Sequence, residues 1–160
     1  MIRRVRLADA PAVCDIYNYY VRNTCITPEE EDITCLEMEN RIAGITKNFP
    51  WLVSEEDNGV TGFAYLHHYV ARSAYRFAVE DSIYIKHGLT GNDSGSRLMA
   101  ALLDEARKMG KHSVVALMER GNEASEALHR KFGFKDIGHL KEAGFKFDKW
   151  VDVSYWQLIL

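Results

Sequence analysis

The most informative segment of the sequence is Ser82-Ile-Tyr-Ile-Lys-His-Gly-Leu-Thr-Gly-Asn-Asp-Ser-Gly-Ser96. Its first residues favour a β-strand, and the polar, glycine-containing stretch after them favours a loop. The apolar residues that follow recur at helical spacing on one face, and they are Leu98, Met99, Leu102, Leu103, Ala106 and Met109. The segment therefore predicts a strand, a loop and a helix in succession, with the helix ending at Gly110.

A loop that opens onto a helix N-terminus can bind an anion. It presents unpaired backbone N–H groups and the positive end of the helix dipole, which suit a pyrophosphate. The glycine spacing matches neither G-x-G-x-x-G nor G-x-x-x-x-G-K-S/T, so the nicotinamide and nucleoside-triphosphate fingerprints are excluded. Gly91 and Gly95 suit a plain tight turn equally well. From the residues alone, the loop is either an anion site or a turn.

The surrounding sequence predicts further strands and helices. Strands are expected over residues 3–7, 51–55, 60–69, 76–85, 113–118, 134–140 and 151–159. Asp57-Asn58-Gly59 has the chemistry of a hairpin turn, because Asn and Gly tolerate positive φ. Helices are expected after Asp9, after Thr34 with Glu37 completing a capping box, and over residues 124–131 before Gly133. The order β-αα-βββ-α-β-α-ββ predicts an α/β fold with a mixed sheet.

Length and composition indicate one globular domain over residues 1–160, with 47% apolar and 27% charged residues. The net charge of −3 gives no bulk electrostatic reason to expect a nucleic-acid or membrane partner. Cys14, Cys25 and Cys35 include no CxxC pair, so neither a disulfide framework nor a metal site is expected. No secretion signal and no run of roughly 20 apolar residues is present, so a cytoplasmic protein is expected.

Several motifs together resemble a known family. Ile83-Tyr-Ile followed by Thr90-Gly-Asn-Asp-Ser-Gly95 is similar to motif A of the GNAT acyl-CoA N-acyltransferases. Residues 121–125 and 128–134 resemble the downstream N-x-x-S/A and L-Y/H-x-K-x-G-F signature of that family. Residues 74–80, 138–147 and 149–152 resemble the phosphinothricin/methionine sulfoximine N-acetyltransferase subgroup. The resemblance runs from Ile2 to Leu158, and it implies the GNAT fold, in which helices flank a mixed, mostly antiparallel central sheet.

The resemblance also implies a reaction and a co-substrate. An acetyl group moves from acetyl-CoA to the amino group of a small amino acid or analogue by direct attack in a ternary complex, without a metal. The residues expected to bind the pantetheine arm through their backbone are Ile83, Tyr84 and Ile85. The loop residues expected to hold the pyrophosphate are Gly91, Asn92, Asp93, Ser94, Gly95 and Ser96, and Asn122 is expected near the thioester. A homodimer is implied as well.

Glu80 and His129 are the expected catalytic residues. A carboxylate at the site can take a proton from the incoming amine before attack, and the subgroup places a glutamate where Glu80 stands. The alternative for Glu80 is a solvated charge at a strand end. His129 occupies the place of a tyrosine that many GNAT members use to protonate the departing thiolate, and a charged histidine can donate there. The alternative is that His129 only packs or hydrogen-bonds near the cofactor.

Three residues are expected to bind the substrate: Arg72, Tyr75 and Glu80. The guanidinium of Arg72 suits the carboxylate of an amino acid, although an exposed loop arginine is the alternative. Tyr75, Phe147 and Trp150 belong either to the pocket wall or to the core. His67 has no partner at metal-ligand spacing and is interpreted as a surface or structural residue.

Two positions depart from motif A. Thr90 stands where the family most often has Arg or Gln, and Asp93 where it has Gly or Ala. A carboxylate repels a diphosphate and its Cβ limits close approach, although Asp tolerates positive φ and its side chain can turn to solvent or cap the helix. We therefore expect weaker acetyl-CoA binding than with the full motif. Two other functions stay open: acetylation of a peptide N-terminus or a polyamine, and a catalytically weakened CoA-binding module.

Overall fold

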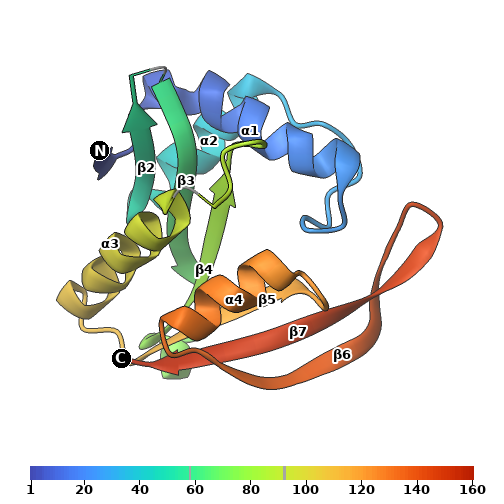
Figure 1. Ribbon diagram of the computed structural model, residues 1–160. Helices are drawn as coiled ribbons and strands as arrows, with labels where there is room; N and C mark the ends of the chain where they lie inside the picture. The colour runs from blue at the N-terminus through green and yellow to red at the C-terminus, as the bar shows by residue number, and fades with distance from the viewer. Residues whose placement is uncertain (58, 92) are drawn as a thin grey trace.

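The computed structural model describes residues 1–57, 59–91 and 93–160, and these form one seven-stranded sheet in the order β1-β2-β3-β4-β5-β7-β6 (Figure 1). The strands are β1 (Ile2–Arg4), β2 (Trp51–Glu56), β3 (Gly59–His68), β4 (Ala78–Ile85), β5 (Ser113–Glu119), β6 (Lys135–Lys146) and β7 (Lys149–Ile159). The α-helices are α1 (Ala10–Asn23), α2 (Cys35–Ile45), α3 (Ser94–Lys108) and α4 (Glu123–Lys131). In this described part, all neighbouring strands are antiparallel except β4 and β5. The predicted fold class and element order are confirmed.

The two faces of the sheet carry separate apolar clusters. Helices α1 and α2 pack on one cluster, where Val13, Met38 and Ile42 contact strand residues such as Trp51 and Phe63. The predicted apolar face of α3 packs on the other cluster, whose helical members include Leu98, Met99, Leu102, Leu103 and Ala106. Helix α4 joins this second cluster through Leu128. Each strand between the clusters is thus held on both faces.

One helix cap agrees with the sequence prediction and another differs from it. The hydroxyl of Thr34 accepts a hydrogen bond from the N–H of Glu37 at 3.1 Å, which caps α2 as predicted. Asp9 precedes α1, but its carboxylate accepts from the N–H of Arg6 and from the guanidinium of Arg3 instead. The segment predicted as a strand over residues 3–7 is also shorter, because Leu7–Asp9 forms a 3₁₀ turn closed by Asp9.

Strand β6 continues six residues beyond the predicted end at residue 140. Its pairing with β7 shifts register twice, between Asp136 and Gly138 and between Leu140 and Gly144. Gly138 and Glu142 take positive φ near these shifts, so the strand bends and resumes instead of ending. A two-residue turn, Phe147-Asp148, with positive φ at both positions, joins β6 to β7. The result is a long hairpin whose tip extends beyond α4 (Figure 1), and Lys146 at this tip contacts the loop between α1 and α2.

The sheet opens between β4 and β5. Their described residues pair in parallel at Ala78 with Ser113, Val79 with Val114 and Glu80 with Val115. Beyond this point β4 continues to Ile85 beside β3, and β5 continues to Glu119 beside β7. One edge of each strand is therefore left facing the other across a gap that begins at Glu80. No helix in the described ranges is long and apolar enough to cross a membrane.

Candidate active site

A cavity of about 920 Å³ occupies the opening between β4 and β5. Its walls come from both strands, the first turn of α3, helix α4, the tip of the β6–β7 hairpin and the loop between α1 and α2. Most of the sequence-predicted site residues line it: Glu80, Ile83, Tyr84, Ile85, Gly91, Asp93, Gly95, Ser96, Asn122 and His129. Ser94 is buried beside them at the start of α3, and Asn92 lies outside the described residues. The opening of the sheet thus brings predicted catalytic and cofactor-binding residues into one space.

Glu80 sits at the point where the two strands separate. Its side chain is 20% exposed. Burial, followed by repulsion from Asp81, raises the pKa of Glu80 to about 7. A carboxyl group with this pKa is partly ionised at neutral pH and can accept a proton there.

His67 lies beside Glu80 on the neighbouring strand. The two residues are register partners on β3 and β4, and Nε2 of His67 lies 3.6 Å from Oε1 of Glu80. Burial lowers the pKa of His67 and favours its neutral form, so it does not offset the desolvation of Glu80. The prediction of His67 as a surface or structural residue missed this position, because the partner of a strand residue follows from hairpin register and not from spacing along the chain.

His129 forms a buried pair with Asp81. Nδ1 of His129 lies 2.7 Å from the carbonyl oxygen of Ser125, and Nε2 lies 3.0 Å from Oδ2 of Asp81. A carbonyl only accepts, so Nδ1 carries a proton. Burial alone lowers the pKa of His129, but the attraction of Asp81, its hydrogen bond and the Ser125 contact together raise it. Oδ1 of Asp81 is buried without a hydrogen-bond partner among the described residues.

The first turn of α3 follows a loop with left-handed backbone. Gly91 has φ of 91° and Asp93 has φ of 67°. The first hydrogen bond of the helix runs from the N–H of Arg97 to the carbonyl of Asp93, which leaves the N–H groups of Gly95 and Ser96 ahead of the helical ladder. Such groups at a helix N-terminus suit an anion.

The side chain of Asp93 does not cap α3. Within the described chain it makes no capping hydrogen bond, and its Oδ1 lies 3.4 Å from Nζ of Lys131. Lys131 also donates to the hydroxyl of Ser96 at 2.8 Å. The contacts with Ser96 and then Lys131 lower the pKa of Asp93. A lysine of α4 therefore stands beside the candidate anion site, and Asp93 is ion-paired to it.

The open edge of β4 carries Ile83, Tyr84 and Ile85. The hydroxyl of Tyr20 donates to the carbonyl of Ile85 at 2.5 Å and fixes the end of the strand. Asn122 is the N-cap of α4, where its Oδ1 accepts from the N–H of Ser125 at 3.2 Å. Its side chain is thus held at the cavity wall by the helix that it begins.

Two predicted substrate residues lie elsewhere. Arg72 is exposed and precedes the 3₁₀ turn Ser73–Tyr75, and Tyr75 packs its ring against Tyr69 at 6.2 Å. Neither belongs to the described residues that line the cavity. Phe147 and Trp150, which sequence assigned to core or pocket, are exposed on the β6–β7 hairpin.

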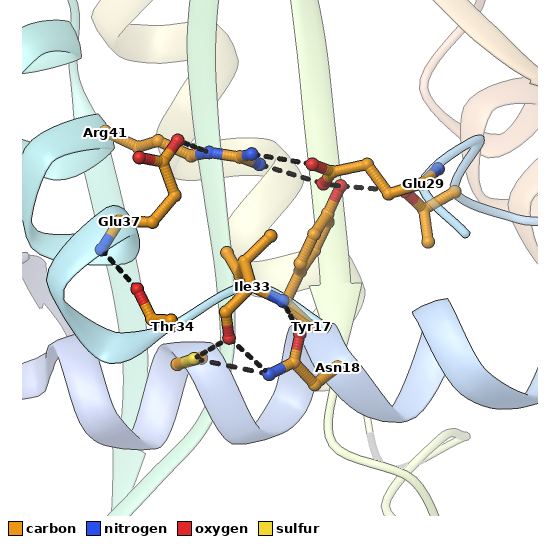
Figure 2. A network of polar contacts seen from close by, with 9 residues as sticks. Tyr17, Asn18, Glu29, Ile33, Thr34, Glu37 and Arg41 are labelled. Atoms are coloured by element: carbon orange, nitrogen blue, oxygen red, sulfur yellow. Dashed lines mark hydrogen bonds and ion pairs between the residues drawn. The ribbon is translucent and has the colours of Figure 1, made fainter. Parts of the chain in front are cut away.

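A polar network fixes the loop between α1 and α2 (Figure 2). This loop contributes residues 25–28 to the cavity wall. The hydroxyl of Tyr17 contacts the hydroxyl of Thr27 at 2.7 Å and donates to Glu29. Arg41 of α2 binds Glu29 through two hydrogen bonds of 2.9 and 2.6 Å. Nζ of Lys146, at the hairpin tip, donates to the carbonyl of Thr27 at 3.0 Å. Lys146 could not be recognised as a site residue from sequence, because a lysine between two phenylalanines in an exposed strand resembles a surface residue.

No group of three His, Cys, Asp or Glu side chains that could hold a metal ion occurs within residues 1–57, 59–91 and 93–160. All three cysteines are free.

Comparison with known proteins assigns this architecture to a family. Residues 2–155 match the Acetyltransferase (GNAT) domain. The phosphinothricin N-acetyltransferase of Streptomyces viridochromogenes is 36% identical, over 98% of this chain and 85% of that protein. The L-methionine sulfoximine/L-methionine sulfone acetyltransferase of Salmonella typhimurium is 35% identical, over 99% and 94%. The crystal structure of a phosphinothricin acetyltransferase from Sinorhizobium meliloti in complex with acetyl-CoA superposes with a TM-score of 0.96 at 34% identity, covering 100% of this chain and 88% of that one.

The chain belongs to the GNAT family of N-acetyltransferases. Within that family it is similar to the phosphinothricin and methionine sulfoximine acetyltransferases over its full length.

Proposed function

We propose that the protein transfers an acetyl group from acetyl-CoA to the α-amino group of a small amino acid or analogue of the methionine sulfoximine or phosphinothricin type. The observation that carries this proposal is Glu80, a carboxyl group with a pKa near 7 where the sheet opens into the cavity. The names of the relatives support the substrate class. We also propose that residues 1–160 act as one N-acetyltransferase domain, because the single sheet supplies both halves of the cavity.

The residues present fit acetyl-CoA, which supplies the activated acyl thioester. The open edge of β4 at Ile83–Ile85 offers backbone donors and acceptors to a peptide-like arm, as a strand edge does to an added strand. The N–H groups of Gly95 and Ser96, with the ammonium of Lys131 beside them, suit a diphosphate. Gly91 and Asp93 shape this loop by their positive φ. Asn122 would approach the thioester end from α4.

Glu80 would act as the general base. An amine is mostly protonated at neutral pH, and ionised Glu80 accepts one of its protons directly or through one water. The neutral nitrogen would then attack the carbonyl carbon of the thioester, the carbon–sulfur bond would break with the sulfur leaving as thiolate, and the nitrogen would release its second proton to solvent as the amide forms. His129 would return a proton to that thiolate. Since Nε2 is its nitrogen bound to Asp81, transfer from there requires the contact with Asp81 to loosen.

We further propose that the protein works as a homodimer. The β6–β7 hairpin exposes at least half the surface of five large apolar side chains, Ile137, Leu140, Phe145, Phe147 and Trp150. An apolar patch on a projecting hairpin suits association with a second copy. Arg72 and Tyr75 are not among the described residues that line the cavity. Their proposed role in substrate binding therefore requires either a second chain or movement of their loop. A solution mass of one chain would contradict the dimer.

A thiol-release assay tests the proposed function. Acetyl-CoA is offered with methionine sulfone, phosphinothricin, a polyamine or a peptide, using the wild type, Glu80→Gln and the exposed control Glu39→Gln. The proposal expects turnover of the amino-acid analogues by wild type and control, and a loss of about 10²-fold or more in Glu80→Gln. Turnover of only peptide or polyamine contradicts the substrate class. No thiol release with any amine, while CoA still raises the melting temperature, identifies a binding module instead.

A further inference from the structure

Lys146 is a buried cation in the cavity wall. It ends β6 at the tip of the hairpin, is 3% exposed and lines the cavity that Glu80 enters from the other arm of the sheet. Its ammonium donates a hydrogen bond to the carbonyl of Thr27 at 3.0 Å and lies 5.1 Å from the ring centroid of Phe147. The lysine is therefore directed inward, although the other residues of its strand are mostly exposed.

No carboxylate of the described residues contacts the ammonium of Lys146 directly, and Glu29, Glu30 and Glu119 act on it from beyond ion-pair distance. Within the described chain, no carboxylate oxygen lies within ion-pair distance of Nζ, and Thr27 provides one acceptor for its three donors. A buried charge without an opposite charge in direct contact is unfavourable. Burial lowers the pKa of Lys146, and the more distant Cys25, Glu30, Glu119 and Glu29 offset only part of that effect. An anion entering the cavity would supply both the missing charge and the missing acceptors.

The position of Lys146 is fixed from two sides. The carbonyl that it binds belongs to Thr27, which is fully buried and whose hydroxyl contacts Tyr17. Glu29 and Arg41 hold Tyr17 in turn (Figure 2). The ammonium is thus fixed before a ligand arrives, which reduces the entropy lost on binding.

We propose that Lys146 binds the carboxylate of the amino-acid substrate and so determines the preference for amino acids over simple amines. This inference rests on the proposed function and adds a specificity residue to the same cavity. Glu80 takes the proton of the amino group from the β4 side, and Lys146 pairs with the acid group from the hairpin side. The ionisable groups that act on Lys146 are Cys25, Glu29, Glu30 and Glu119, and none of them is a competing cation.

Matched substrates test the role of Lys146. Methionine sulfone and 3-(methylsulfonyl)propylamine differ by the carboxylate alone, and kcat/KM is measured for both with the wild type, Lys146→Met and Lys146→Arg. We expect Lys146→Met to lower kcat/KM about 10- to 100-fold with methionine sulfone, which is the range for a hydrogen bond to a charged group. With the amine we expect kcat/KM to fall less than about 3-fold, because the carboxylate that Lys146 would bind is missing. Lys146→Arg should recover part of the loss. Lys149→Met, which removes the same charge from the exposed register partner of Lys146, serves as the control.

Other outcomes overturn the inference. An equal loss with both substrates indicates that Lys146 only ties the hairpin to the loop at Thr27. Loss of carboxylate preference in Arg72→Ala but not in Lys146→Met assigns the role to Arg72. Calorimetric titration with CoA, expected to be unchanged in Lys146→Met, shows that the variant is folded. If the wild type turns over neither substrate, the proposed function itself fails, which is a different result from a wild type that acts on both without help from Lys146.

Discussion

Replacing Glu80 with Gln should make the protein more stable and less active at the same time. Glu80 is held in a site that disfavours its charge, through burial and the neighbouring Asp81. Gln has nearly the same shape and no charge, so it removes both the unfavourable ionisation and the proton acceptor. The gain in stability and the loss of activity should both grow over the pH range in which Glu80 of the wild type ionises.

The magnitude follows from the pKa. A folded value of about 7, against an ordinary 4.5, means that ionised Glu80 is disfavoured in the folded chain by about 3 kcal/mol. One fifth of the side chain is exposed and partly screened, so we expect about 2 kcal/mol. Because the folded pKa is raised, the wild type loses this stability as the pH rises from about 4.5 to about 7. Glu80→Gln should therefore match the wild type near pH 4.5 and exceed it near pH 8.

Thermal unfolding at about pH 5 and about pH 8 measures the effect, with Glu39→Gln as the control for loss of an exposed carboxylate. The expected gain in melting temperature at the higher pH is about 4–8 °C. Turnover at that pH should fall by about 10²-fold or more. A pH-independent difference in melting temperature would refute the raised pKa, and unchanged turnover would remove Glu80 from the reaction.

Four further substitutions have defined outcomes. His67→Lys places a cation beside the catalytic carboxylate and should move the midpoint of the pH–rate profile toward acid by about one unit; an unmoved midpoint contradicts the contact. Asp81→Asn should destabilise the protein by about 3 kcal/mol in urea unfolding at acid pH, where His129 is charged, and less as the pH rises through the raised pKa of that histidine; a loss constant with pH contradicts the ion pair. Arg41→Met should loosen the α1–α2 loop and raise KM for the amine about 5-fold with CoA affinity unchanged, while equal weakening of both ligands argues against it. Asp93→Gly should tighten CoA binding about 3- to 10-fold in calorimetry, since it frees the neighbouring lysine and suits the positive φ; equal or weaker binding refutes this.

The sequence predicted the element order and most helix faces because those features repeat locally. Leu98 and Leu102 recur at helical spacing, and Thr34 with Glu37 is a local capping signal that the structure confirms. The end of β6 was predicted wrongly, because a strand that bends at bulges is interrupted in sequence by the same residues that end a strand.

The site was predictable where a motif is contiguous and less so where it is assembled from distant parts. The strand–loop–helix segment led to the β4 edge and the α3 N-terminus. His67 lies next to Glu80 because of the register between β3 and β4, and Asp81 lies next to His129 because α4 packs against the sheet. Lys146 became a buried cation through a contact with a residue 119 positions away. Such pairs depend on tertiary distance, which periodicity does not report.

Because of the opening between β4 and β5, the two halves of β4 should exchange their backbone amide hydrogens with solvent at different rates. Near Val79 the backbone is paired on both sides and should exchange its amide hydrogens slowly. A few residues on, toward Ile85, β4 keeps its β3 neighbour and loses its β5 neighbour, so amides that face the gap should exchange fast although they lie in the middle of the sheet. A ligand lying along that edge would slow them. Hydrogen exchange along this one strand would then record occupancy of the cavity residue by residue, without any catalytic turnover.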